Sequence, residues 1–316
     1  MCDQAELQAG QKLSIPAAGK GEFAAAPFLA LLLVTAVWGS TFFLIKDLVQ
    51  FVPPDDFLGI RFAIAALLIV IFQFPRLRRA SAQTWKQGAV LGGAYAIAQW
   101  LQTVGLLHTD ASVSGFITGM YVVFTPLIAA LVLHTKMSLK VWSAVLLATV
   151  GLGILSLRGF ALGWGETLTL AGALMYAIHI ILISRYTKNA DVIALALIQI
   201  VFVGVFLGSA CLFDGVRFPV TAPMWGSLLY MALFAGLGAL VLQTWAQSRI
   251  SATTAAIVMT TEPVFAAGFA VMFGGESLTF RLVLGGILVL TAMLLIETKS
   301  ATSPDESAAE NSVGEN

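Results

Sequence analysis

A carboxylate lies inside a long apolar segment of this sequence, at Glu262, directly before Pro263. An ionisable group in apolar surroundings is expensive and usually faces the protein interior or a wet cavity. The proline that follows frees a backbone carbonyl one turn earlier and weakens a helix locally. One interpretation is a carboxylate that carries a proton or binds an ammonium group. In the other, Glu262 forms a hydrogen bond to a neighbouring helix and holds a kink at Pro263.

Two further ionisable residues lie within apolar stretches, at His179 and Arg61. A neutral imidazole can both donate and accept a hydrogen bond, and it can titrate near neutral pH. His179 is therefore a candidate proton carrier, with a satisfied hydrogen bond between helices as the alternative. Arg61 has three interpretations: it extends toward lipid headgroups, it pairs with Asp55 or Asp56, or it binds a carboxylate of a substrate.

Residues that would carry out catalysis or hold a metal form no recognisable pattern. The sequence has no GxSxG, HExxH or Walker motif. His108, His134 and His179 fall in different segments. Cys2 and Cys211 are far apart, and we interpret them as two unpaired thiols. The sequence therefore predicts no enzyme activity, no cofactor and no metal site.

The composition indicates which kind of element positions these side chains. Of the 316 residues, 59% are hydrophobic and 11% are charged, and the mean hydropathy is +0.91. A soluble protein has roughly 25% charged residues, so this chain lacks the charged surface of a soluble globule. We predict an all-α polytopic protein whose surroundings are the lipid bilayer. The formal net charge is zero, and nothing in it suggests a nucleic-acid partner.

Apolar stretches long enough to cross a bilayer recur along the whole chain. We expect ten transmembrane helices, near 28–50, 57–75, 86–107, 111–134, 139–157, 164–186, 191–213, 223–247, 251–273 and 279–297.

The distribution of Lys and Arg predicts the orientation of these helices. With the N-terminus in the cytoplasm, the inside segments hold 12 Lys and Arg residues and the outside segments hold 4. This excess favours cytoplasmic positions for both termini, and we expect a multi-pass protein of a bacterial inner (plasma) membrane. Residues 1–26 are then an N-terminal cytoplasmic tail, and residues 298–316 are an acidic tail that we expect to be disordered.

The two halves of the sequence resemble each other when the chain is shifted against itself by about 138–141 residues. Leu101-Gln102-Thr103 then falls on Leu242-Gln243-Thr244, Trp38 on Tyr176, and Thr41 on His179. We therefore predict two five-helix repeats, at 27–157 and 158–297. Because five is odd, the second repeat enters the membrane from the opposite side, and the two repeats are inverted. Inverted repeats are typical of secondary transporters, which bind substrate where the repeats meet.

The candidate substrate-binding residues are the polar and aromatic side chains within the expected helices. Glu262 and His179 are also the candidates for proton coupling. The full set is Trp38, Thr41, Gln102, Tyr121, Tyr176, His179, Gln243, Trp245 and Glu262. For the aromatic members, plain packing is the alternative.

An ordered series of motifs resembles EamA-type transporters of the drug/metabolite transporter superfamily. The series is WGSTF at 38–42 followed by Lys46, LGIRF at 58–62, Gln199, ISATTAAIVMTTEPVFAA at 250–267, GESL at 275–278, and Gly285-Gly286. The resemblance covers residues 28–297 and implies ten helices in two repeats and movement of small metabolites, drugs included. One departure is Lys136-Met137, where the second half has Gly275-Glu276.

These observations predict a secondary transporter that moves a small amino-acid-like, polar or amphipathic solute, or a drug, by alternating access. We expect export, with coupling to protons through Glu262 or His179 if there is any. An uncoupled facilitator is the nearest alternative, and a membrane receptor or scaffold is a more distant one, because the chain has no large soluble domain. The sequence leaves open whether the chain forms a homodimer.

Overall fold

The computed structural model describes residues 25–133, 139–158, 161–188, 190–210, 215–250, 255 and 258–300, and nearly all of these are helical. The expected tails, 1–26 and 298–316, lie almost wholly outside the described residues. The helices are α1 (Ala25–Leu48), α2 (Pro54–Arg79), α3 (Ala82–Leu106), α4 (Ala111–Thr118), α5 (Tyr121–Leu133), α6 (Leu139–Ser156), α7 (Trp164–Tyr186), α8 (Val192–Ala210), α9 (Ala222–Tyr230), the π-helix η1 (Met231–Gly238), α10 (Ala239–Gln247), α12 (Glu262–Met272) and α13 (Phe280–Ser300). A short antiparallel pair joins β1 (Leu157–Arg158) to β2 (Ala161–Leu162).

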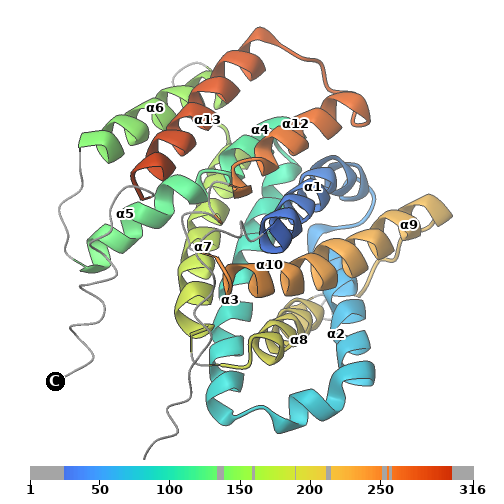
Figure 1. The fold of residues 1–316 in the computed structure, drawn as a ribbon. Coiled ribbons are helices and arrows are strands. Elements are labelled where there is room, and N and C mark those ends of the chain that lie inside the picture. The colour runs from blue at the N-terminus through green and yellow to red at the C-terminus, as the bar shows by residue number, and fades with distance from the viewer. Residues whose placement is uncertain are drawn as a thin grey trace, which may run out of the picture.

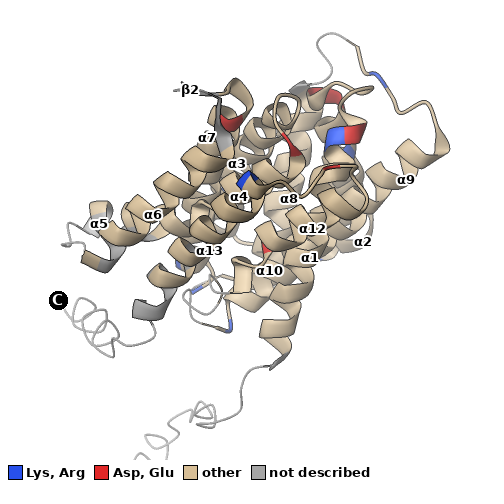
Figure 2. Ribbon diagram, turned by 90° about the horizontal axis from the view of Figure 1, so that it is seen from above, with Lys and Arg blue, Asp and Glu red and all other residues tan. Residues whose placement is uncertain are grey.

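Several of these helices can cross a membrane. By length and composition, five qualify among the described residues, and four shorter apolar helices accompany them. The five are Ala26–Leu48, Pro54–Arg79, Trp164–Tyr186, Val192–Ser209 and Ala222–Gln247. Figure 2 shows that charged residues lie mainly toward the helix ends and in the loops, and that the helix bodies between them contain few. Apart from the short β1–β2 pair, the described residues therefore form a helical protein of the multi-pass membrane type.

Local sequence explains where α2 begins and ends. Proline is favoured in the first turn of a helix, where its missing N–H costs nothing, and Pro54 occupies that turn. Asp55 and Asp56 follow it, and Arg76, Arg78 and Arg79 lie in the last turn. Acids at the start and bases at the end complement the helix dipole. Because α2 begins three residues before the expected span at 57–75, Arg61 lies two turns inside it.

Three of the expected spans depart from a regular α-helix: two are interrupted by a turn, and one is a continuous helix with a π-helical segment. The span expected at 111–134 divides into α4 and α5 at a turn formed by Gly119 and Met120. The span at 223–247 contains the π-helix η1. The span at 251–273 has a turn at Thr260-Thr261, after which α12 begins at Glu262. Pro263 therefore occupies the first turn of a new helix, and it does not kink a continuous one as expected.

Close helix pairs are made possible by glycine, as in other membrane helix bundles. A Cβ atom on Gly204 of α8 would lie 2.5 Å from the carbonyl oxygen of Phe62 in α2. A Cβ atom on Gly105 of α3 would lie 2.8 Å from the carbonyl oxygen of Gly165 in α7. The same kind of close approach joins α6 to α13, which lie side by side in Figure 1, and α1 to α12.

Candidate functional site: a polar cavity and a clamp at one end of it

A small cavity of about 30 Å³ lies in the interior, where helices from both halves of the chain converge. It has room for roughly two water molecules, so a metabolite can enter only if the surrounding helices move. Eight of the nine predicted residues line it: Trp38, Thr41, Gln102, Tyr121, Tyr176, His179, Gln243 and Glu262. The lining also contains Phe42, Arg61, Tyr95, Gln99, Thr118, Ile180 and Met259.

A chain of hydrogen bonds crosses one wall of the cavity and connects α3, α4 and α7. Gln99 Nε2 donates to Tyr176 Oη at 2.8 Å, and Tyr176 Oη donates to Gln102 Oε1 at 3.0 Å. Gln102 Nε2 in turn donates to Thr118 Oγ1 at 2.9 Å. A buried amide needs such partners because apolar surroundings offer none. Sequence reasoning missed Gln99, although its position three residues before Gln102 places it on the same helical face.

Glu262 faces the same cavity from the other half of the chain and is 5% exposed. Tyr121 Oη donates to Glu262 Oε2 at 2.8 Å and lies 3.2 Å from the carbonyl oxygen of Met259. The carboxylate sits in the first turn of α12, where the positive end of the helix dipole favours negative charge. The structure therefore contains the hydrogen bond between helices that the sequence suggested.

His179 is buried on α7 and is fixed by a neighbouring amide. Its Nε2 lies 2.9 Å from Gln199 Oε1, and Gln199 Nε2 donates to Thr244 Oγ1 at 3.2 Å. The imidazole ring lies 5.1 Å from the ring of Tyr95, centroid to centroid. The satisfied hydrogen bond between helices, one of the two interpretations of His179, is thus present at the edge of the cavity.

The two glutamines of the repeated LQT motif both line the cavity, but their partners differ. Gln102 is bonded at both ends of its amide, whereas Gln243 Oε1 is buried with no hydrogen-bond partner among the described residues. Gln243 is 2% exposed. A buried acceptor without a partner is costly, so this oxygen is suited to a donor from a bound solute.

Trp38 lines the cavity and also contacts the π-helix. Its Nε1 donates to the carbonyl oxygen of Ala235 at 2.9 Å, and Thr41 Oγ1 donates to the carbonyl oxygen of Trp38 at 2.7 Å. Single π-helical turns are rare and occur frequently at functional sites. Carbonyl groups of the π-helix therefore accept hydrogen bonds from cavity-lining side chains of the first half of the chain.

Trp245 lies apart from the cavity, although we predicted it as part of the same site. It lines a separate, mostly apolar groove of about 760 Å³ formed by α1, α2, α8, η1 and α10. The guanidinium of Arg249 lies 4.7 Å from the centre of its ring. Residue type and repeat position did not reveal that this side chain points to the outer face of α10.

Arg61 is a cavity residue whose environment the sequence left undecided. It is 1% exposed, so it does not extend toward lipid headgroups, and among the described residues it has no ion pair with Asp55 or Asp56. Asp56 Oδ2 instead accepts a bond from the backbone N–H of Arg217 at 3.1 Å, and Asp55 accepts one from Trp100 Nε1. Two interpretations of Arg61 are therefore wrong: it neither extends toward lipid headgroups nor pairs with Asp55 or Asp56.

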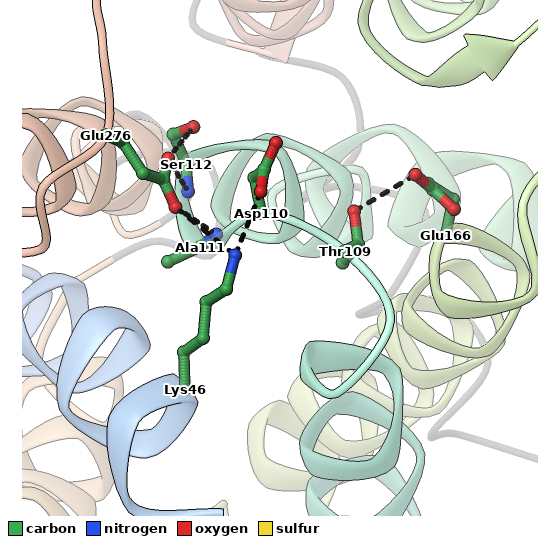
Figure 3. Close-up of polar contacts among 7 residues, drawn as sticks. All are labelled: Lys46, Thr109, Asp110, Ala111, Ser112, Glu166 and Glu276. Carbon is green, nitrogen blue, oxygen red and sulfur yellow. Dashed lines mark hydrogen bonds and ion pairs between the residues drawn. The ribbon is translucent and has the colours of Figure 1, made fainter. Parts of the chain in front are cut away.

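A second polar cluster, the Lys46 clamp, lies at the end of the bundle where α1 ends (Figure 3). It consists of Lys46, Asp110, Ser112 and Glu276. Lys46 Nζ lies 2.9 Å from Asp110 Oδ1 and 3.7 Å from Glu276 Oε1. Glu276 Oε1 accepts the backbone N–H of Ala111 at 2.6 Å, and Glu276 Oε2 accepts the N–H and the hydroxyl of Ser112.

In the clamp, the N-terminus of α4 is capped by a residue distant in the sequence and not by the residue that directly precedes the helix. Asp110 is the residue at which α4 would ordinarily be capped, but its side chain makes no cap hydrogen bond and pairs with Lys46. Glu276 caps α4 instead, and Gly275 allows the turn that presents it by adopting φ of +70°, a conformation natural to glycine. The clamp thus connects α1, α4 and the α12–α13 turn.

Comparison with known proteins identifies the relatives of this chain. The sequence profile of the EamA-like transporter family matches residues 26–157 and again residues 163–298. The chain belongs to the EamA-like transporter family. The resemblance seen in the sequence is thereby confirmed, and the family is one of membrane transporters.

Similar proteins described as transporters come from archaea and bacteria. An uncharacterized transporter of Archaeoglobus fulgidus is 34% identical over 272 residues, which are 86% of this chain and 85% of that protein. The uncharacterized inner membrane transporter YedA of Escherichia coli K12 is 26% identical, over 85% of this chain and 90% of its own. A solved crystal structure superposes with a TM-score of 0.64 at 13% identity, covering 88% of this chain and 99% of the other. This last likeness concerns the fold alone.

Proposed function

We propose that this chain is a secondary transporter that moves a small metabolite, an amino-acid-like or other polar or amphipathic solute or a drug, across the membrane by alternating access. The observation that carries the proposal is the buried polar cavity at the meeting point of the two family matches. Eight residues selected from the sequence alone line it, and one of them, Gln243, has a buried side-chain oxygen without a hydrogen-bond partner among the described residues.

We further propose that the chain consists of two inverted five-helix repeats. The family profile matches twice, at 26–157 and 163–298. The helix contacts also occur in related pairs: α3 with α7 and α10 with α1, α5 with α7 and α12 with α1, and α3 with α8 and η1 with α2. Such pairing is what a pseudo-twofold axis in the membrane plane produces.

Two interrupted helices that contribute residues to the cavity lining support a transport role. Tyr121 is the first residue of α5 after the Gly119-Met120 turn, and Glu262 is the first residue of α12 after the Thr260-Thr261 turn. Discontinuous membrane helices form the substrate and ion sites of many secondary transporters, because their free helix ends face the bound group. In this proposal Glu262 carries a proton during export, and an uncoupled facilitator is the alternative.

The proposed location is a bacterial inner membrane with both termini in the cytoplasm. The excess of Lys and Arg in the segments on the N-terminal side supports this orientation, as does the relative described as an inner membrane transporter. In this orientation the Lys46 clamp closes the outer end of the cavity. Release of a solute to the outside then requires the residues of the clamp to move apart.

Counterflow in proteoliposomes tests the transport function. Purified protein is reconstituted, loaded with an unlabelled solute and supplied with the labelled one, over a panel of amino acids, nucleosides, sugars and cationic drugs. We expect saturable counterflow of at least one compound. Gln243→Leu, in the cavity, should reduce it, whereas Gln73→Leu, the same change on the exposed part of α2, should not. Absence of counterflow across the panel would count against a carrier.

A further inference from the structure

The guanidinium of Arg61 is a buried positive charge at the edge of the cavity with an unused hydrogen-bonding edge. Its Nε donates to the carbonyl oxygen of Met231 in the π-helix at 3.2 Å, and its Nη1 donates to Gln99 Oε1 at 3.4 Å. A guanidinium has five N–H donors, and these two bonds occupy one donor on Nε and one on Nη1. Both donors of Nη2 and one of Nη1 are left.

The bond to Met231 limits which N–H donors of the guanidinium are available to a ligand. Because Nε is held by the π-helix and Nη1 also binds Gln99, the donors left are both of those on Nη2 and the second one on Nη1. The rings of Phe62 and Phe57, centred 4.9 Å and 5.8 Å from Arg61 Cζ, flank the group and keep it from rotating freely. A fixed pair of parallel N–H donors matches the two oxygens of a carboxylate.

None of the carboxylates that lie near Arg61 in sequence, or line the cavity with it, forms an ion pair with it. Asp56 binds the backbone of Arg217, and Glu262 accepts its bond from Tyr121. Within the described part of the chain, no ion pair involves Arg61. Burying a charge without a partner is strongly unfavourable, so the arrangement is costly unless an anion joins it for part of the cycle.

We propose that Arg61 binds the carboxylate of the transported solute, which makes a small organic acid or an amino acid the substrate class. This inference rests on the proposed function of the cavity. Arg61 is the only Lys or Arg among its described lining residues, so the site matches one negative charge better than the two of a phosphate monoester. The aromatic rings of Trp38, Tyr95 and Tyr176 provide an apolar wall for the rest of the molecule.

Thermal unfolding with matched ligand pairs tests this assignment. The purified full chain in nanodiscs is heated with phenylacetate or phenylacetamide, with L-phenylalanine or L-phenylalaninamide, and with L-leucine or L-leucinamide, at a series of concentrations. The members of a pair differ only at the carboxylate. We expect at least one carboxylate to raise the unfolding temperature while its amide does not. Arg61→Gln should weaken that binding roughly 10- to 100-fold, the usual effect of losing a charge-assisted bidentate pair.

Two further variants distinguish a loss of carboxylate binding from a loss of the folded structure. Arg61→Lys keeps the charge but loses the fork, so its affinity should fall between those of the wild type and Arg61→Gln. Arg217→Gln removes an exposed cation away from the cavity and should bind like the wild type. The assignment is overturned if no carboxylate binds, if the amides bind equally well, or if Arg61→Gln binds as tightly as the wild type. Carboxylate binding without counterflow would reject transport and leave the Arg61 site standing.

Discussion

Tyr121 Oη donates a hydrogen bond to Glu262 Oε2 at 2.8 Å, and each of the two residues is the first of a helix that follows a break. They lie 141 positions apart in the sequence, one in each of the two segments that match the family profile. The bond therefore joins two helix starts across the cavity. In the proposed proton-carrying role, protonation of Glu262 would weaken this bond, because a neutral carboxyl group is a weaker acceptor than a carboxylate.

Neutralising Glu262 should separate proton coupling from solute exchange. Glu262→Gln keeps the size of the side chain and can still accept a bond from Tyr121, but it cannot exchange a proton. We expect it to abolish accumulation driven by a pH gradient and to leave counterflow within about threefold of the wild type, since solute exchange needs no net proton movement. Both are measured in the same proteoliposomes, with and without an imposed pH gradient.

Tyr121→Phe provides the matched comparison for this carboxylate. It removes the hydroxyl donor and leaves the acid in place, so pH-driven accumulation should persist with a changed pH dependence. Unchanged pH-driven accumulation in Glu262→Gln would exclude Glu262 as the proton carrier and favour an uncoupled facilitator or His179.

Removing the charge of Lys46 should open the end of the bundle where the clamp lies. The side chains of Lys46 and Glu276 are 28% and 15% exposed, so their pairing is less screened than an ordinary surface ion pair. We expect Lys46→Met to increase the population of the open conformation roughly three- to tenfold relative to the closed one. Spin labels at the exposed positions Leu107 and Leu278, in a Cys2→Ser, Cys211→Ser background, report this as a longer distance between them.

The control for the clamp is another exposed cation in the same part of the protein. Arg217→Met removes an equal charge outside the clamp and should leave the label distances unchanged. Glu276→Gln should act in the same direction as Lys46→Met, because it weakens both the ion pair and the cap of α4. High salt should also lengthen the distance in the wild type, as screening weakens the pair. If neither clamp variant changes the distance distribution, the clamp does not hold this end closed.

Much of the helical fold could be predicted from the sequence. The span expected at 164–186 coincides with α7, and the span at 191–213 differs from α8 by only a few residues at its ends. Long apolar runs bounded by polar or proline-containing turns define such helices almost by themselves. The cavity residues could also be anticipated in large part, because polar side chains that recur in two related halves must avoid lipid.

The irregular points within the helices, and the contacts between residues distant in the sequence, could not be predicted in the same way. The turn at Gly119-Met120 and the π-helix occur within mostly apolar sequence, where periodicity carries no signal. The capping of α4 by Glu276 joins residues 164 or more positions apart. Whether an aromatic residue such as Trp245 faces the cavity or the lateral groove depends on helix rotation, which tertiary contacts decide.

Asp191 should stabilise the protein in a pH-dependent manner. Partial burial raises its pKa, but the N–H groups of Ala194 and Ile193 and the guanidinium of Arg76 outweigh this, so its pKa lies below the ordinary 3.8. A lowered pKa means that the stabilisation is present above the pKa of the unfolded chain and is lost as the pH falls through the folded value. Asp191→Ala should therefore destabilise the protein by ~1 kcal/mol at neutral pH, the usual cost of a lost cap.

Asp191→Asn is the matched variant for that measurement. The amide oxygen can still accept the N–H bonds at the start of α8, but the ion pair with Arg76 is lost. Because both partners of this pair are nearly half exposed, at 44% and 49%, Asp191→Asn should differ from the wild type by well under 1 kcal/mol. Thermal unfolding at pH 7 and near pH 3 compares the three proteins, and a defect of Asp191→Ala that does not shrink at the lower pH would contradict the assignment.

Gly204 should tolerate no side chain, because α8 packs on α2 at the turn that carries Arg61. A Cβ atom there would lie 2.5 Å from the carbonyl oxygen of Phe62 and 2.6 Å from Cβ of Ala66. Backbone atoms cannot yield as a flexible side chain does, so Gly204→Ala must push the two helices apart, at a cost of ~1–3 kcal/mol typical of overpacking. Thermal unfolding measures this loss in nanodiscs.

The same substitution on an open helix face provides the control, because there it should not lower the stability of the protein. A Cβ atom on Gly93 of α3 meets nothing within 4 Å, so Gly93→Ala should be neutral or stabilise the helix by up to ~1 kcal/mol. Phe62 adjoins Arg61, so separation of α2 from α8 by Gly204→Ala should also move the guanidinium relative to Met231 and weaken carboxylate binding. If Gly204→Ala is as stable as Gly93→Ala, the close contact of α2 with α8 does not exist in the membrane. If it is destabilised but binds carboxylates normally, Arg61 is positioned by η1 and not by α8.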